Sequence, residues 1–409
     1  MRYIFIFFVV LYSCNNNKES RYVNNVNSDT IRIDTDQIDE MYFSKIFTKV
    51  DCIPLETRPE CIFGEISKLK LNDNRFFILD KQTLSLLIFD VEGRFIHKIS
   101  QVGRGPREYT SLNNFFIDNQ NNWIILDGGS KFLYFDMNTF DFLKEERKAI
   151  NAESVYLGNE TFAYYMKNSK WNGNKYNIHV FQNQQLIYQH LPISEKLEGY
   201  NFTHEYNFFQ SDNHGNTFFI EMLNDAVYSL NADSMVVAYY IDFGKDKLPE
   251  NFLDNIPAEQ RIERLLRSTY CKSVTDFVKN DNINYFRFTF NGNVVTYINL
   301  YERKESFMFH TSINDLNFYV GDISLFLFCD STSIYSWIQM FDFKEKFSFI
   351  KKAEENLKEF EKENKNLTTE QKNEVEIYRK EIQTVKDRLK NISEQSEEDN
   401  PVIFRWYFR

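Results

Sequence analysis

A strand–turn–strand pattern that recurs about every 47 residues constrains this chain more than any other feature of its sequence. Three copies align, at 69–80, 114–127 and 207–221. Each is an apolar run, a turn rich in Asn, Asp or Gly, and a second apolar run that ends in an acid: Asp80, Asp127 or Glu221. Asp127 follows Asp80 by 47 positions, and Glu221 follows Asp127 by 94, which is twice 47. The run 162–166 fits the copy expected between the last two.

A third apolar run follows each acid by about ten residues, and a tight turn such as that at Gly93 leads into a fourth. Four strands in 40–50 residues is the period of a propeller blade. One four-stranded sheet cannot bury both of its faces, whereas sheets stacked around an axis can. We therefore predict an all-β fold, a six-bladed β-propeller with a C-terminal helical hairpin insertion. The predicted blades are 62–100, 111–148, 153–192, 205–243, 283–312 and 314–343; a β-sandwich or a pair of β domains is the alternative.

Two segments interrupt the repeat with helical patterns. Residues 255–267 predict a short helix, with Pro257 in its first turn and Ile262, Leu265 and Leu266 on one face. The larger insertion, 344–399, contains no Gly or Pro and is densely charged. Its apolar residues are spaced 3-4-3, which predicts antiparallel helices at 344–364 and 369–394 joined along a heptad seam. The seam residues are Ile350, Ala353, Leu357, Phe360, Val375, Tyr378, Ile382, Val385, Leu389 and Ile392.

The ends of this insertion suggest how the chain closes on itself. Thr368 and Gln371 are spaced as a capping box for the second helix. The hairpin either packs on the propeller rim or serves as a docking arm for a partner or a second copy. Residues 401–409 alternate as a strand, which we expect to complete the last blade together with a strand from 47–57. Closure of this kind removes exposed sheet edges, which promote aggregation.

The amino terminus has the layout of a lipoprotein leader. Arg2 precedes an apolar run that is too short to span a bilayer, and the run ends in Leu11-Tyr12-Ser13-Cys14. This sequence resembles the bacterial lipobox, so residues 1–13 are predicted to be a signal peptide and Cys14 the lipidated residue. Residues 14–29 are polar and predict a flexible tether before the propeller at 30–409. The expected location is the bacterial cell envelope, with a lipid anchor in the outer membrane; either leaflet fits.

The net charge and the cysteine content limit the kinds of partner and metal that we expect the protein to bind. A net charge of −11 argues against nucleic acid, which requires a basic surface. Beyond Cys14 the chain has Cys52, Cys61, Cys271 and Cys329. An exported protein permits disulfides, and Cys52 and Cys61 could pair if a strand turns back between them; four packed thiols is the alternative. No Cys or His spacing predicts a metal site.

One motif carries a family resemblance. Residues 103–109, Gly-Arg-Gly-Pro-Arg-Glu-Tyr, resemble the G-x-G-P-G-E-[FY] signature of NHL-like propellers, and 50–57 give a second match. With the lipobox, these features are similar to the six-bladed β-propeller lipoproteins of Bacteroides-type bacteria, over about residues 30–409. The resemblance implies fold and location more than activity. Arg107 replaces the usual third glycine, so the backbone turn there is expected to differ.

Candidate ligand residues lie in two kinds of loop. In a propeller, the loops between second and third strands and the connections between blades meet on one face, which is where a ligand is expected. Arginines there can bind a carboxylate or phosphate, and aromatic rings can stack on a sugar. For each single residue, a solvated charge or a rim aromatic is the structural alternative. The candidates are Arg104, Arg107, Glu108, Tyr109, Lys131, Trp171, Tyr200 and His204.

The sequence contains none of the familiar catalytic motifs: no HExxH, GxSxG, P-loop or EF-hand loop. No cofactor is predicted, no motif supports calcium, and no catalytic residue can be named. The favoured hypothesis is a membrane-anchored module that binds a glycan, a peptide or a protein. A propeller-type lyase or hydrolase is the first alternative, and an assembly protein acting through the helical hairpin is the second.

Overall fold

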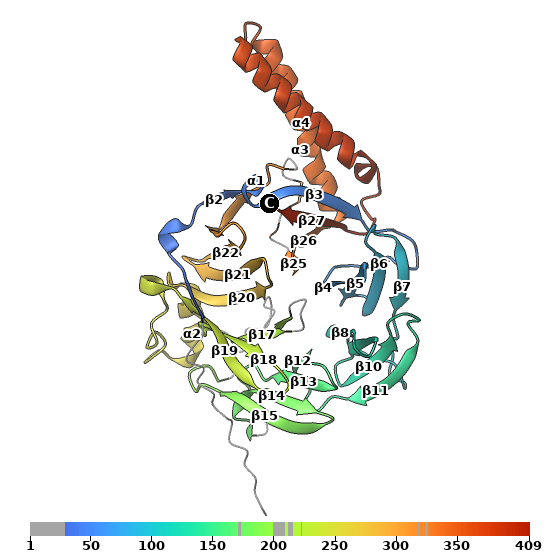
Figure 1. Cartoon of the computed structure of the whole chain (residues 1–409), viewed down its shortest axis with the longest axis vertical. Coiled ribbons are helices and arrows are strands. Elements are labelled where there is room, and N and C mark those ends of the chain that lie inside the picture. Colours follow the sequence, from blue (N-terminus) through green and yellow to red (C-terminus); the bar gives the residue numbers. More distant parts are fainter. Residues whose placement is uncertain are drawn as a thin grey trace, which may run out of the picture.

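Six sheets of four or five strands are arranged in a ring. The computed structural model describes residues 29–170, 173–198, 209–211, 216–221, 223–316, 320–321, 323 and 326–409. In this part of the chain the six sheets stand side by side around one axis, and a helical hairpin extends outward from the rim (Figure 1). The chain is therefore a six-bladed β-propeller with a C-terminal helical hairpin, as predicted.

The first four blades follow the repeat. Blade 1 contains β4 (Lys68–Asn72), β5 (Arg75–Asp80), β6 (Ser85–Asp90) and β7 (Phe95–Ile99). Blade 2 contains β8 (Asn114–Asp118), β9 (Trp123–Asp127), β10 (Lys131–Asp136) and β11 (Phe142–Arg147). Blade 3 contains β12 (Glu153–Tyr156), β13 (Thr161–Tyr165), β14 (Tyr176–Gln182) and β15 (Gln185–Pro192). Blade 4 contains β16 (Phe209–Ser211), β17 (Thr217–Ile220), β18 (Ala226–Leu230) and β19 (Met235–Asp242).

The last two blades differ from the prediction in extent. Blade 5 contains β20 (Lys272–Lys279), β21 (Ile283–Phe290), β22 (Asn293–Leu300) and β23 (Glu305–Phe309), so it begins before the predicted residue 283. Blade 6 contains β25 (Phe326–Cys329), β26 (Ser333–Ile338), β27 (Val402–Phe408) and β3 (Phe47–Pro54). Strand β20 was missed because its register against β21 shifts twice, which removes the regular alternation on which the prediction relied.

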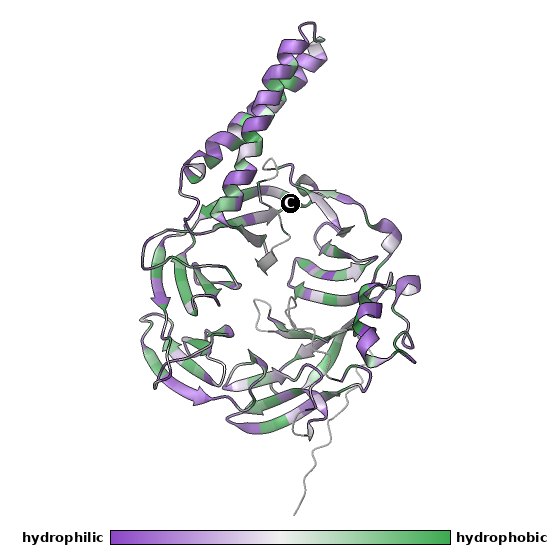
Figure 2. Ribbon diagram, turned by 180° about the vertical axis from the view of Figure 1, so that it is seen from behind, coloured by the Kyte–Doolittle hydropathy of each residue, from purple (hydrophilic) through white to green (hydrophobic). Residues whose placement is uncertain are grey.

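The core lies between the blades, as the stacking argument requires. One buried cluster joins blades 1 and 2 through Phe77, Leu126 and Leu133. Another joins blades 4 and 5 through Val227 and Phe286. The apolar residues follow the strands around the whole ring, while the hairpin is mostly polar (Figure 2). Each blade thus buries its two faces against its neighbours.

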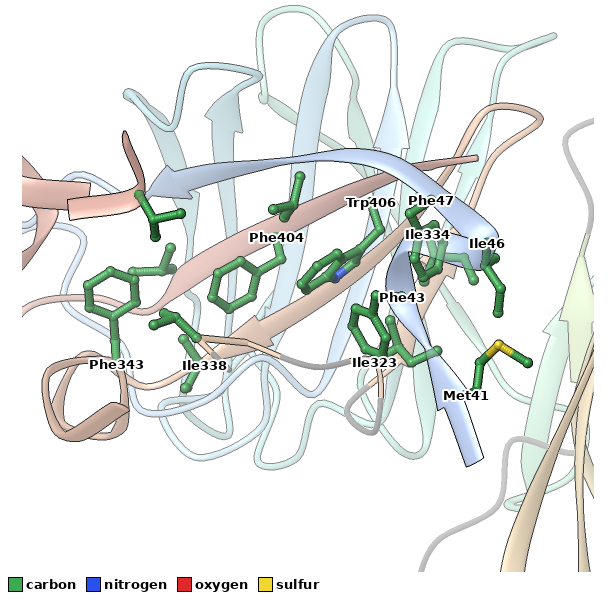
Figure 3. Close-up of a cluster of buried hydrophobic side chains, with 14 of the residues drawn as sticks. Met41, Phe43, Ile46, Phe47, Ile323, Ile334, Ile338, Phe343, Phe404 and Trp406 are labelled. Carbon is green, nitrogen blue, oxygen red and sulfur yellow. The ribbon is translucent and has the colours of Figure 1, made fainter. Parts of the chain in front are cut away.

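Closure of the ring depends on the two ends of the described chain. Strand β27 pairs with β26 on one side and with β3 on the other, where Trp406 faces Val50. Trp406 is fully buried, its indole N–H donates to Ser336 Oγ at 2.8 Å, and its ring meets Phe43 edge-on at 4.9 Å. Figure 3 shows this cluster, with Phe404 and Trp406 on β27 beside Phe43 and Phe47. The strand predicted to close the propeller therefore does so.

The segment before β3 wraps around the outside of the ring. Strand β1 (Asp29–Arg32) adds to the edge of blade 4, parallel to β19. Strand β2 (Glu40–Tyr42) then pairs in parallel with β24 (Thr311–Ile313), beyond blade 5. The short helix α1 (Phe43–Ile46) leads into β3 in blade 6. Within this strap, β1 covers the edge of blade 4 that β19 would otherwise leave open.

Both predicted helical insertions are present, with differences in detail. Helix α2 (Ala258–Leu266) is preceded by Pro257 as its N-cap residue, and only Leu265 of its predicted apolar face is buried; Leu266 is 70% exposed. Helices α3 (Met340–Glu363) and α4 (Thr369–Ser393) form the hairpin. The predicted capping box is present, because Thr368 Oγ1 accepts from the Gln371 N–H at 3.2 Å and Gln371 Oε1 accepts from the Thr368 N–H at 3.0 Å.

The hairpin seam is buried only near the propeller. Phe343, Ile350 and Leu389 belong to the same core cluster as Trp406. Farther out, Phe360 and Tyr378 are 43% and 41% exposed. The hairpin thus packs on the rim at its base and extends away from it at its tip. None of the described helices is long and apolar enough to cross a membrane.

The strand-ending acids of the repeat hold the loops that follow them. Asp80 accepts hydrogen bonds from the Gly64 and Gln82 N–H groups, at 2.9 Å each, and from Thr83 Oγ1 at 2.6 Å. Asp127 accepts from the Gly129 N–H at 3.0 Å and pairs with the Lys148 amine at 2.7 Å. These acids define one side of the ring, here called the loop face, where second-to-third-strand loops meet the connections between blades.

The four described cysteines are free thiols, and Cys52 and Cys61 form no disulfide. Cys61, Cys271 and Cys329 are buried, and Cys52 is partly buried. The Cys61 thiol donates to the Glu56 carbonyl at 3.1 Å. Of the two alternatives left open by the sequence, the structure has the packed thiols.

Substitutions in the hairpin should separate its packed base from its exposed tip. We expect Leu389→Ala to lower the free energy of unfolding by about 2–5 kcal/mol, because Leu389 is fully buried and its loss leaves a cavity. Ile377→Ala, at a residue that is 58% exposed, should change it by less than about 0.5 kcal/mol. Denaturant unfolding measures both variants; equal losses would contradict this division of the hairpin.

The buried pair of Lys148 and Asp127 should contribute strongly to stability as a unit. Both side chains are at most 2% exposed. We expect Lys148→Met to cost about 3–5 kcal/mol, because it leaves a buried carboxylate without a cation, and a second change, Asp127→Asn, to recover part of that loss. The exposed pair of Lys245 and Asp36 provides the control: Lys245→Met should leave the free energy of unfolding close to that of the wild type, because solvent screens an exposed ion pair. A Lys148→Met variant as stable as this control in denaturant unfolding would refute the expectation.

Candidate functional site

The motif at 103–109 forms a tight turn between blades 1 and 2. Glu108 Oε2 accepts from the Gly105 N–H at 2.7 Å, and a Cβ on Gly103 would stand 2.0 Å from the same oxygen. The buried Tyr109 donates from its hydroxyl to the Leu84 carbonyl at 3.0 Å, and burial raises its pKa to about 12. In the structure, Glu108 and Tyr109 therefore hold this connection together rather than point at an open site.

Arg107 occupies a backbone conformation that favours glycine. Its φ is +65°, in the left-handed region that favours glycine. Its backbone N–H donates to Glu145 Oε2 at 2.9 Å, and its guanidinium stands 4.9 Å from the centre of the Phe142 ring. Arg107 thus holds a left-handed backbone conformation while contacting two residues of β11.

The other candidates divide into exposed residues and residues outside the described part of the chain. Arg104 is exposed on the same turn. The Lys131 amine pairs with Glu145 at 2.6 Å, so Lys131 and Arg107 meet at one carboxylate. Cys14, Trp171, Tyr200 and His204 lie outside the described residues. The structure brings Arg107, Glu108, Tyr109 and Lys131 together, as a contact between blades 1 and 2.

A pocket of about 340 Å³ opens elsewhere on the loop face. Three separate segments form it: the connection between blades 3 and 4, the loop after Glu221, and the long connection from blade 4 to blade 5. Tyr240 and Phe252 contribute aromatic rings, and leucines contribute aliphatic surface. The lining residues are Ser194, Lys196, Leu197, Glu221, Leu223, Asn224, Asp225, Ala226, Tyr240, Lys247, Leu248, Pro249, Glu250, Phe252, Leu253, Cys271 and Lys272.

Two lysines at this pocket already have acidic partners. The Lys247 amine pairs with Asp225 at 2.9 Å, and the pKa of Lys247 is raised mainly by that hydrogen bond. The Lys196 amine pairs with Asp254. These two pairs join the long connection to its neighbours and thereby fix the pocket wall. Their charges are largely compensated within the chain.

Glu221 and Lys272 are different, because each meets neutral partners. Glu221 accepts from the amide groups of Asn177, at 2.5 Å, and Asn224, at 3.3 Å. Burial raises the pKa of the Glu221 carboxyl against the effect of these two hydrogen bonds. The Lys272 amine donates to the Ser268 carbonyl at 2.9 Å and to its hydroxyl at 3.3 Å, and burial lowers its pKa. The pocket therefore holds one carboxylate and one amine that no described residue neutralises.

Sequence reasoning missed most of this pocket. Glu221 was recognised as a member of the repeat, but nothing in the local sequence marks Lys272 or the long connection as a site. The pocket exists only because three distant segments meet. No group of three or more His, Cys, Asp or Glu residues that could hold a metal occurs among the residues that the structure describes.

The fold has clear structural relatives. A crystal structure of a protein from Bacteroides fragilis that is named as an exported protein superposes with a TM-score of 0.67 at 17% identity, over 94% of this chain and 99% of that one. A member of the DUF4221 family from Bacteroides vulgatus matches 88% of this chain and 96% of its own, at 10% identity and a TM-score of 0.47. No curated protein matches the chain.

The family comparison covers nearly the whole propeller. The matching family is described as Domain of unknown function (DUF4934), and the match runs over residues 26–405, from just before β1 into β27. It therefore includes every blade, the motif at 103–109, the pocket on the loop face and the helical hairpin. By this match, the chain belongs to the DUF4934 family.

Proposed function

We propose that this protein is a lipid-anchored binding module of the bacterial cell envelope, and that the pocket on its loop face takes up the ligand. The observation that carries the proposal is the pocket itself. Its volume of about 340 Å³ lies within the range of small-ligand sites. Its lining combines aromatic rings, aliphatic side chains and charges of both signs, a combination suited to a small polar ligand or to one residue of a longer glycan or peptide.

The position of the pocket also suits a binding role. It lies among connections, which carry binding residues more often than strands do, while the strands beneath provide a rigid support. The ion pairs of Lys247 with Asp225 and of Lys196 with Asp254 fix the pocket walls, so the lining side chains need little further ordering when a ligand binds. Rigid sites bind more tightly because less conformational entropy is lost on binding.

The anchor is supported by the leader sequence. The exported Bacteroides fragilis relative supports an envelope location.

The lipid anchor can be tested with one cysteine. In cells of a Bacteroides species, the full chain should incorporate labelled palmitate and sediment with membranes. We expect Cys14→Ser to abolish both, since Cys14 is the proposed acylation site. Cys52→Ser, which changes a cysteine within the propeller, is the control and should behave as the wild type. Continued labelling of the Cys14→Ser variant would exclude this anchor.

The binding role can be tested by blocking the pocket. We expect the protein to bind members of a glycan or peptide array, and Ser194→Trp to weaken this binding at least tenfold, because Ser194 is exposed and lines the pocket. Glu195→Trp adds the same bulk at an exposed neighbour outside the pocket and should bind normally. Array ligands that bind both variants equally would refute the pocket. A ligand consumed on incubation would favour the alternative of a hydrolase or lyase.

A further inference from the structure

In blade 2 the acid of the repeat forms an ion pair with a lysine, whereas in blade 4 the acid of the repeat and a lysine of the next blade do not pair. In blade 2, Asp127 ends the second strand, and Lys148 comes from the connection that enters the next blade. Their side chains meet at 2.7 Å, and both are buried. In blade 4, Glu221 follows the second strand, and Lys272 opens β20, the first strand of the next blade. Both blades thus bring a lysine to the loop face that carries the acid of the repeat, although Lys148 directly follows the last strand of its blade and Lys272 begins the first strand of the next.

In blade 4 the two groups do not pair. Among the described residues, Glu221 accepts from Asn177 and Asn224, and Lys272 donates to Ser268. Both residues line the pocket, and no ion pair joins them. Among the residues that the structure describes, no lysine or arginine pairs with Glu221, and no acid pairs with Lys272.

Two charged groups without partners of opposite charge destabilise the folded protein unless a bound ligand supplies those partners. A buried charge without a counterion is strongly unfavourable, whereas a charge with a hydrogen-bonded partner of opposite sign is not. Lys247 cannot serve Glu221, because its amine pairs with Asp225. Lys196 cannot serve it either, because its amine pairs with Asp254. Among the described residues, one anionic and one cationic group of the same pocket therefore have no partner of opposite charge.

We propose that the pocket binds a zwitterion that carries both an ammonium and a carboxylate group, such as a free α-amino acid or the termini of a short peptide. The inference rests on the proposed binding function and names its ligand class. The ligand ammonium donates to Glu221, and the ligand carboxylate accepts from Lys272. In blade 4 the bound ligand thus links the acid and the lysine, which in blade 2 pair directly. Leu223, Phe252 and Leu253 offer apolar surface to an aliphatic side chain.

Two amide neighbours prepare Glu221 for this role. The side-chain amide of Asn177 also donates to the side-chain oxygen of Asn168 at 2.9 Å, and the side-chain amide of Asn224 donates to the Tyr228 hydroxyl at 3.1 Å. These bonds fix the two amides, and the amides in turn fix the carboxylate. Because they supply no positive charge, the carboxylate keeps its attraction for an ammonium group. Pre-orientation of this kind reduces the entropy lost on binding.

Calorimetry with the full chain and four matched probes tests the proposal. We expect leucine or dileucine to bind, and N-acetyl-leucine and leucine amide, which lack the ammonium and the carboxylate charge respectively, to bind at least tenfold more weakly. A preference between leucine and dileucine distinguishes a free amino acid from a peptide as the source of the charges. Probes that bind equally well whatever their charge would overturn the proposal.

Two substitutions assign the two ends of the ligand. Glu221→Gln should weaken leucine at least tenfold and bring its affinity close to that of N-acetyl-leucine, which already lacks the ammonium. Lys272→Met should weaken leucine as much and bring its affinity close to that of leucine amide, which already lacks the carboxylate charge. Circular dichroism and the melting temperature show whether each variant is folded; if Lys272→Met is not, Lys272→Arg, which keeps the charge, should retain binding. Folded variants that bind leucine like the wild type refute the assignment. If the array ligands are neutral glycans and Ser194→Trp abolishes their binding, the zwitterion proposal is refuted while the binding function is upheld.

Discussion

The inability of one four-stranded sheet to bury both of its faces is the constraint on which this structure depends. Each blade presents apolar residues on two sides, so each needs two neighbours, and only a closed ring provides them for all six. The ring closes where β27 pairs with β3, whose residues lie some 350 positions apart in the chain. Trp406, Phe43 and Phe47 fill the space beside this seam. The helical base and the N-terminal strap pack into the same cluster, so closure also positions the hairpin.

The parts of the fold that could be predicted are those encoded locally. Blades 1, 2 and 4 were predictable because each repeats an apolar run, a polar turn and an acid. Blade 3 was predictable because its strand falls at the expected spacing, and the hairpin because its apolar spacing continues through both helices. The first strand of blade 5 was not, because a connection of almost thirty residues precedes it and bulges disturb its alternation. Helix α2 was located correctly, but its buried face was not, because Ile262 and Leu266 remain exposed.

The candidate site was predictable only in its position on the loop face. Glu108 and Tyr109 lie in a motif, but a motif in a turn is retained for the turn it forms: Glu108 binds a backbone N–H of its own loop, and Tyr109 binds a neighbouring carbonyl. The pocket, by contrast, arises from contacts between segments far apart in sequence. Lys196, Glu221 and Lys272 come together through the packing of blades 3, 4 and 5, which no local pattern records.

One repeated position serves three different purposes in this propeller, and the difference lies in its partners. Asp80 is surrounded by N–H and hydroxyl donors and completes a loop. Asp127 meets a lysine and joins two blades by a buried ion pair. Glu221 has a longer side chain and amide partners only, and the lysine that enters from the next blade bonds elsewhere. At one of its copies, the repeat thus carries charges that no described residue compensates. In a ring of similar blades, a binding site can arise in this way without any new motif.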